Sequence, residues 1–123
     1  MKQDKELRNQ LVALLTVRQA HVDFEDVVAD FPAEHINTKA ANCSYSFWHL
    51  LEHLRLCQKD ILEYITSENY VCPNFPDDLW PEQSATTDLK GWQASVERFI
   101  SDRNELVKII ENPKTDLFAP LPN

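Results

Sequence analysis

The fold of this chain is decided by one stretch, Ser46-Phe47-Trp48-His49-Leu50-Leu51-Glu52-His53-Leu54-Arg55. Its large apolar residues recur every three or four positions, and the same row continues to Ile65. That spacing places them on one face of an α-helix. Because a serine hydroxyl can cap the first turn, we predict a helix over residues 45–66 that begins near Ser44 or Ser46.

Two further apolar rows of the same period flank this helix. The first predicts a helix over residues 3–30, which Pro32 stops, and the second predicts a helix over 87–112, which ends before Pro113. Arg103 interrupts the apolar row of the last helix. We expect its guanidinium to reach solvent at the rim of the helix rather than to pair with an acid that points inward.

The connections between the predicted helices are rich in proline. With one glycine and seven prolines, the chain is better suited to helices than to hairpins. The connection over residues 67–86 is long for a bundle, and we expect its aromatic side chains to pack over one end of the helices. Residues 113–123 lack helical periodicity. The sequence therefore predicts an all-α fold in a single helical-bundle domain, residues 1–123.

The charge of the chain narrows the classes of partner. Twelve basic and 20 acidic residues give a net charge of −8. Nucleic acids and anionic membranes select basic surfaces, so neither is expected as a partner. No apolar run has the length of a membrane span, and we expect a cytoplasmic protein. Cys43, Cys57 and Cys72 match no zinc or redox spacing and are expected to be free thiols.

The histidines are the candidate metal ligands. His49 and His53 lie four residues apart, on one side of the predicted helix. If the first two helices are antiparallel, His21 lies at nearly the same height as His53. Glu25 then lies level with His49, where a carboxylate can orient an imidazole. The alternative interpretation is that these histidines form ordinary hydrogen bonds at the edge of the core, with His49 in a supporting or solvent-exposed role.

Several segments resemble one protein family. The stretch 46–55, continued by Asp60-Ile61-Leu62-Glu63, resembles the second-helix motif of the DinB-like superfamily of four-helix-bundle metalloproteins. Ala20-His21 with Phe31-Pro32 resembles the first helix of one branch of that family. Thr115-Asp116-Leu117-Phe118-Ala119-Pro120 resembles the segment that follows its third helix. The resemblance covers most of residues 11–122.

The resemblance implies a metal site that this chain only partly contains. Members of the family bind a divalent metal such as Zn or Ni through three histidines, of which His53 matches the one on the second helix. The other two lie on a final helix that has no counterpart here, so His21 and His49 are the replacement ligands within the chain. Characterised relatives include thiol-dependent transferases, which implies a small-molecule thiol as a partner.

The same comparison predicts an antiparallel bundle whose fourth-helix position is empty or filled by a partner subunit. An exposed apolar groove at that position favours a homodimer. The chain is then either a metal-dependent relative of those transferases with an incomplete site or a non-enzymatic, self-associating interaction module. A third interpretation is a binder of small ligands through the aromatic connection and the bundle core. Whether the chain is an enzyme stays open at this point.

Overall fold

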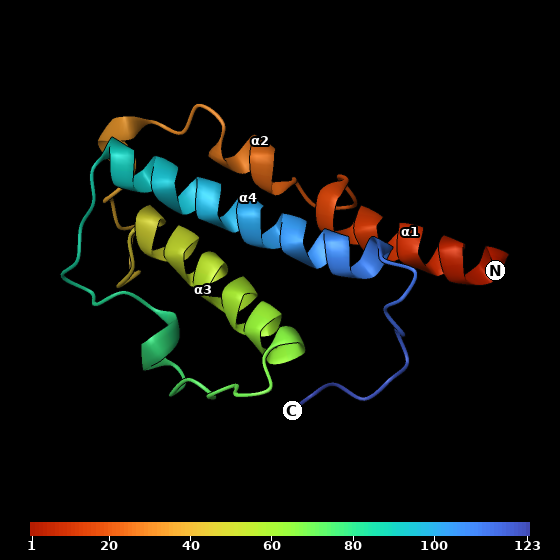
Figure 1. The fold of residues 1–123 in the computed structure, drawn as a ribbon. Coiled ribbons are helices and arrows are strands. Elements are labelled where there is room, and N and C mark those ends of the chain that lie inside the picture. The colour runs from red at the N-terminus through yellow and green to blue at the C-terminus, as the bar shows by residue number, and fades with distance from the viewer.

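The structure is a computed structural model that describes all 123 residues, and it is all-α, as predicted. Figure 1 shows four α-helices joined by extended connections. Single 3₁₀ turns lie within two of the connections, and one isolated bridge pair is the sole β-type contact. The helices are α1 (Lys2–Thr16), α2 (Phe24–Val28), α3 (Phe47–Thr66) and α4 (Leu89–Glu111).

Helix α3 begins at a capping box. The Ser46 hydroxyl accepts a hydrogen bond from the backbone N–H of His49 at 3.1 Å, and the Ser46 N–H donates to Nδ1 of His49 at 3.0 Å. Glutamate or glutamine usually fills the second role, and here an imidazole does so. The predicted start at Ser46 and the predicted end at Thr66 are both confirmed.

Helix α4 also follows its sequence signals. The Asp88 carboxylate accepts a hydrogen bond from the N–H of Gly91 at 2.8 Å and caps the first turn. The helix ends at Glu111, two residues before Pro113. The prediction of a helix over 87–112 is therefore confirmed to within two residues at each end.

The predicted helix over residues 3–30 is wrong. Helix α1 ends at Thr16, and an irregular segment precedes the five-residue helix α2. Two local features explain the break. Thr16 and Val17 are β-branched and poor helix formers, and Asp23 accepts a hydrogen bond from the N–H of Asp26 and so starts a new helix. The continuous apolar row in the sequence hid this break.

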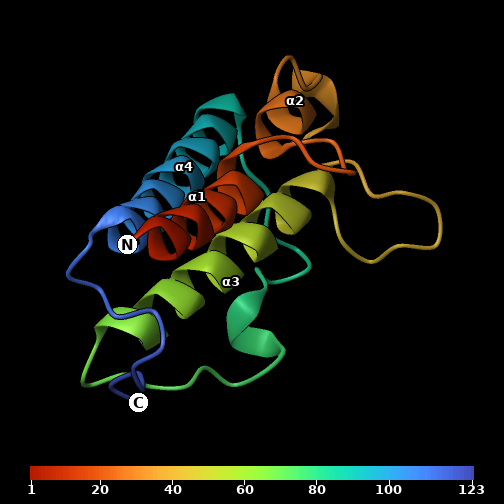
Figure 2. The same ribbon diagram turned by 90° about the vertical axis from the view of Figure 1, so that its right-hand side faces the viewer.

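Helix α4 is the centre of the molecule, and both α1 and α3 pack against it. In Figures 1 and 2, α3 runs parallel to α4 and α1 runs antiparallel to both, while α2 lies beside the middle of α4. Because α3 and α4 are parallel, the chain must return along the whole length of α3, and residues 67–86 make this return. No helix is long and apolar enough to cross a membrane.

We predicted that the aromatic residues of this connection pack over one end of the bundle. In the structure they lie elsewhere. Trp80 lies along the side of α3, where its ring stacks on His53, and it also stacks on Tyr45, which precedes the helix, with centroids 3.7 and 4.1 Å apart. Phe75 is 78% exposed. The return path runs beside α3 rather than across the ends of the helices, so only the side of α3 is within reach.

The most buried apolar residues gather near the N-terminal ends of α3 and α4. Ile36, Leu51 and Trp92 form this cluster, and Phe31 stacks on Trp92 with centroids 4.7 Å apart. Leu106, in the C-terminal half of α4, is the one other buried apolar residue. At that end of the molecule, polar contacts also join α1 to α4.

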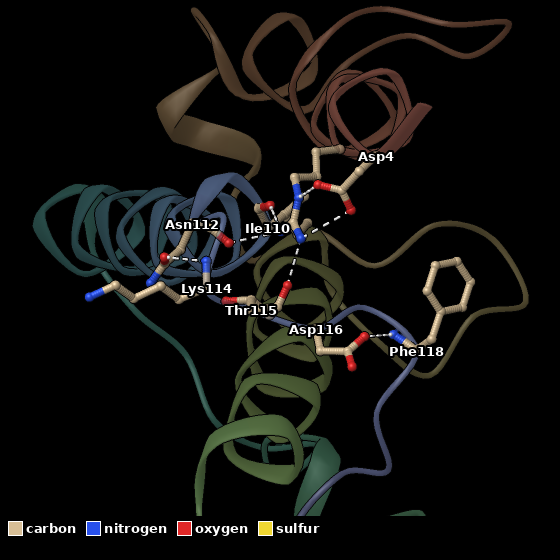
Figure 3. Close-up of polar contacts among 8 residues, drawn as sticks. Asp4, Ile110, Asn112, Lys114, Thr115, Asp116 and Phe118 are labelled. Atoms are coloured by element: carbon tan, nitrogen blue, oxygen red, sulfur yellow. Dashed lines mark hydrogen bonds and ion pairs between the residues drawn. The ribbon is translucent and has the colours of Figure 1, made fainter. Parts of the chain in front are cut away.

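Those polar contacts centre on Arg8 of α1, which is 7% exposed. Its guanidinium donates hydrogen bonds to the carbonyl oxygens of Ile110, Asn112 and Thr115 at 2.6–2.8 Å and pairs with Asp4. Figure 3 shows these groups converging at the end of α4. The last carbonyls of a helix lack partners within the helix, so Arg8 caps α4 and fixes the start of the tail.

Candidate functional site

His49 is fully buried and uses both of its ring nitrogens in structural hydrogen bonds. Nδ1 accepts from the Ser46 N–H, and Nε2 lies 2.8 Å from the carbonyl oxygen of Ala85. A carbonyl can only accept, so Nε2 carries the proton. This arrangement corrects the expected solvent-exposed role of His49. Its imidazole joins the first turn of α3 to the segment that leads into α4, and neither nitrogen has a free lone pair for a metal.

His53 lies one turn further along α3, between an indole and a sulfur. Trp80 stacks on its ring at a centroid distance of 3.7 Å, and Nδ1 lies 2.7 Å from the carbonyl oxygen of Leu79. The Cys57 sulfur is 3.7 Å from Nδ1 and 3.6 Å from Nε2. Nearly equal distances to the two nitrogens place the sulfur over the ring face. The Leu79 carbonyl can only accept, so Nδ1 carries the proton and Nε2 keeps its lone pair. Cys57 does not lie along that lone pair.

Cys57 is a protonated thiol at neutral pH. Its burial, together with the nearby negative charge of Asp60, raises the pKa of the thiol. Asp60 also accepts a hydrogen bond at 2.6 Å from the hydroxyl of Tyr70, and this bond raises the tyrosine pKa. The thiol is therefore placed for packing against His53 rather than for nucleophilic attack. Like Cys57, the other two cysteines are free, as predicted.

His21 lies in the irregular segment between α1 and α2, and it is exposed. The argument that placed it level with His53 required a continuous first helix, and α1 ends five residues before His21. No group of three or more His, Cys, Asp or Glu side chains is arranged to hold a metal ion. The structure thus does not bring His21, His49 and His53 together. Metal binding by this chain stays a prediction from the sequence.

Arg103 is buried inside the bundle, contrary to the expectation that it reaches solvent. It is 7% exposed and pairs with Glu25 of α2, which therefore does not orient His49. The hydrogen bond from Arg103 lowers the pKa of the Glu25 carboxyl. Nε of Arg103 has no partner. The pair ties α2 to α4, beside the stacked rings of Phe24 and Phe99, whose centroids lie 4.0 Å apart.

The molecule also has a hollow with a wholly apolar lining. A hollow of about 130 Å³ between α2 and α3 is lined entirely by apolar side chains. Phe24 also lines a second hollow, of about 320 Å³, at the junction of α1 and α2; half of its ten lining residues are polar or charged, among them Arg18 and Asp23. Along α3 the row continues to Ile61, which is 54% exposed. We name this surface the inner apolar face, defined by Leu14, Val22, Val27, Leu50, Leu54 and Ile61.

The sequence predicted half of this surface. The apolar row of α3 is visible in the spacing of Leu50, Leu54 and Ile61, and an empty fourth-helix position was expected beside it. Sequence reasoning missed the part contributed by Val22 and Val27, because both were assigned to one long helix. The turn that presents them follows from the Asp23 cap, which was a detectable signal.

No family model, curated protein or solved structure matches this chain. The DinB-like resemblance therefore rests on the sequence motifs alone.

Proposed function

We propose that this chain is a non-enzymatic helical interaction module that associates through its inner apolar face. The observation that carries this proposal is the hollow between α2 and α3, whose nine lining residues are all apolar. Leu54, which lines this hollow, is 52% exposed, and Leu50 and Ile61 on the same helix are 41% and 54% exposed. Contiguous apolar surface of this kind marks interaction sites in soluble proteins.

The geometry of the four helices explains why the face lacks a partner within the chain. Both α1 and α3 pack against α4, and they hardly contact each other. A bundle closes when every helix buries its apolar stripe against neighbours. Here α3 packs against α4 on one side and against the return connection at His49 and His53, while Leu50, Leu54 and Ile61 stay more than 40% exposed. The fold thus supplies one side of a helix–helix interface.

The donor groups support this proposal over a metalloenzyme. A catalytic zinc site takes three protein ligands and keeps one open position. In this chain His49 has no free lone pair, His21 lies on a separate segment, and the Cys57 sulfur lies over the ring of His53. His53 Nε2 is the single donor left in the expected position. The residues present therefore do not fit the metal that the resemblance implies.

A fluorescent probe of apolar surface tests the proposal. Anilinonaphthalene sulfonate should bind the dilute native protein, and Leu54→Glu should reduce the bound-dye fluorescence at least threefold, because a carboxylate in the hollow is costly. Val71→Glu is the matched control, since Val71 is 83% exposed on the return connection. Equal fluorescence for all three proteins, with folding verified by circular dichroism, would contradict the proposal.

Metal binding separates the proposal from its main alternative. Equilibrium dialysis against Zn²⁺ and Ni²⁺ should leave less than about a tenth of an equivalent bound, as one imidazole is a weak site. The His53→Ala protein should behave like the exposed-site control His35→Ala. Retention of a full equivalent that depends on His53 would support the metalloprotein instead.

A further inference from the structure

The occupant of the inner apolar face follows from the area and charge of that face. We propose that it is a second copy of this chain, which packs its own inner apolar face against the first in a symmetric dimer. This inference rests on the proposed function, because it names the partner of the same surface. In a two-fold dimer each chain offers the same patch, so the surface must be complementary to itself.

The composition of the face meets that requirement. None of its six residues carries a charge or a hydrogen-bonding group in its side chain. The hollow between α2 and α3 has no charged side chain, whereas the hollow that contains Leu14 and Val22 is also lined by Arg18 and Asp23. Two copies that meet through α3 and the hollow between α2 and α3 bury no unpaired charge, which is the main obstacle to pairing identical patches. On α2, Glu25 is paired with Arg103 of the same chain, and Asp26 is exposed beside Val27.

The area of the face is close to what a stable dimer needs. Its six residues are each between 41% and 65% exposed. Together they offer on the order of 500 Å² of apolar surface, and a standard interface of about 800 Å² per partner contains roughly that much, since about 60% of it is non-polar. The remainder would come from polar side chains at the rim.

The net charge provides a signature that separates a second copy from a different partner. Two chains of net charge −8 repel each other at long range, and added salt screens this repulsion. Dimer formation through an uncharged face should therefore become tighter as the salt concentration rises. A partner helix rich in lysine and arginine would show the opposite dependence, because salt weakens its attraction to an acidic chain.

Sedimentation equilibrium of the purified full chain tests the inference. Between about 1 and 100 µM the native protein should change from monomer to dimer, and its dissociation constant should fall at least threefold between 50 and 500 mM NaCl. Leu54→Glu and Ile61→Glu should stay monomeric, whereas Val71→Glu should dimerise like the native protein. Circular dichroism shows whether each variant is folded. One folded variant of the two, Leu54→Glu or Ile61→Glu, is sufficient for the test.

Three results are informative in different ways. A native protein that remains monomeric at 100 µM, yet binds anilinonaphthalene sulfonate in a Leu54-dependent manner, overturns the second copy and leaves the proposed function standing. A monomer that shows no such dye binding overturns both. A dimer that both face variants form as readily as the native protein overturns this interface.

Discussion

At the scale of single residues, the histidines show that a sequence motif can be identified correctly while its role is not. The spacing of His49 and His53 was read correctly as one side of a helix, and Ser46 was identified as a cap. The hydrogen bonds of His49 depend on Ala85, which lies 36 residues away in sequence, and no spacing rule predicts that contact. A buried imidazole that satisfies two backbone groups looks, in the sequence, the same as a metal ligand.

Removal of the His49 side chain should be strongly destabilising. His49→Ala leaves the Ser46 N–H and the Ala85 carbonyl without partners and opens a cavity, so we expect a loss of about 2–4 kcal/mol in the free energy of unfolding. His49→Gln should lose less, because glutamine also completes a capping box. Urea denaturation measures both, with exposed His35→Ala as the control. A loss below about 0.5 kcal/mol for His49→Ala would show that the imidazole is not a structural tie.

At the scale of elements, the ends of helices were easier to predict than their continuity. The Asp88 cap and Pro113 bounded α4 correctly. The break after Thr16 went unnoticed because the apolar row continues through it. The Arg8 cap on α4 could not be foreseen, since it joins residues more than a hundred positions apart. Polar contacts at that distance depend on how helices pack, and a single sequence does not reveal them.

The Arg8 cap gives a prediction for the C-terminal end of α4. Arg8→Ala leaves three carbonyl groups without their donor, and we expect the free energy of unfolding to fall by about 2–3 kcal/mol. Arg8→Lys should recover less than half of that loss, because an ammonium cannot reach all three groups as a planar guanidinium does. Urea denaturation compares these variants with Arg98→Ala on the exposed side of α4. A full recovery by lysine would argue that charge alone matters.

The pairing of α2 with α4 predicts a dependence on pH. The Glu25 carboxyl has a pKa below its ordinary value of 4.5, so its contribution to stability is present above pH 4.5 and is lost as the pH falls through the lowered value. Glu25→Gln should cost about 1–2 kcal/mol at pH 7, less than a fully buried pair, since the carboxylate side chain is 43% exposed. The stability of the Glu25→Gln protein should also fall less steeply than that of the native protein between about pH 5 and pH 3. Urea denaturation across that range measures both effects. A variant with the same acid dependence as the native protein would show that Glu25 does not respond to acid through Arg103.

At the scale of the whole molecule, the all-α class could be predicted from the sequence, but the arrangement of the helices could not. The helical periods of α3 and α4 were sufficient for the class. The parallel course of these two helices explains the long connection over residues 67–86, whose length alone gave no direction (Figure 1). The small core, with four buried apolar residues, is consistent with a chain that completes its burial by association.

The central claim is that the stripe of α3 with Leu50, Leu54 and Ile61 is buried by a second copy of the chain. The most direct measurement is isotope-filtered nuclear magnetic resonance on a one-to-one mixture of ¹³C-labelled and unlabelled protein at high concentration. We expect intermolecular nuclear Overhauser effects at the methyl groups of Leu54 and Ile61 and none at those of Val71. The absence of intermolecular effects at all three residues, in a sample that tumbles as a 14.3 kDa monomer, would contradict it.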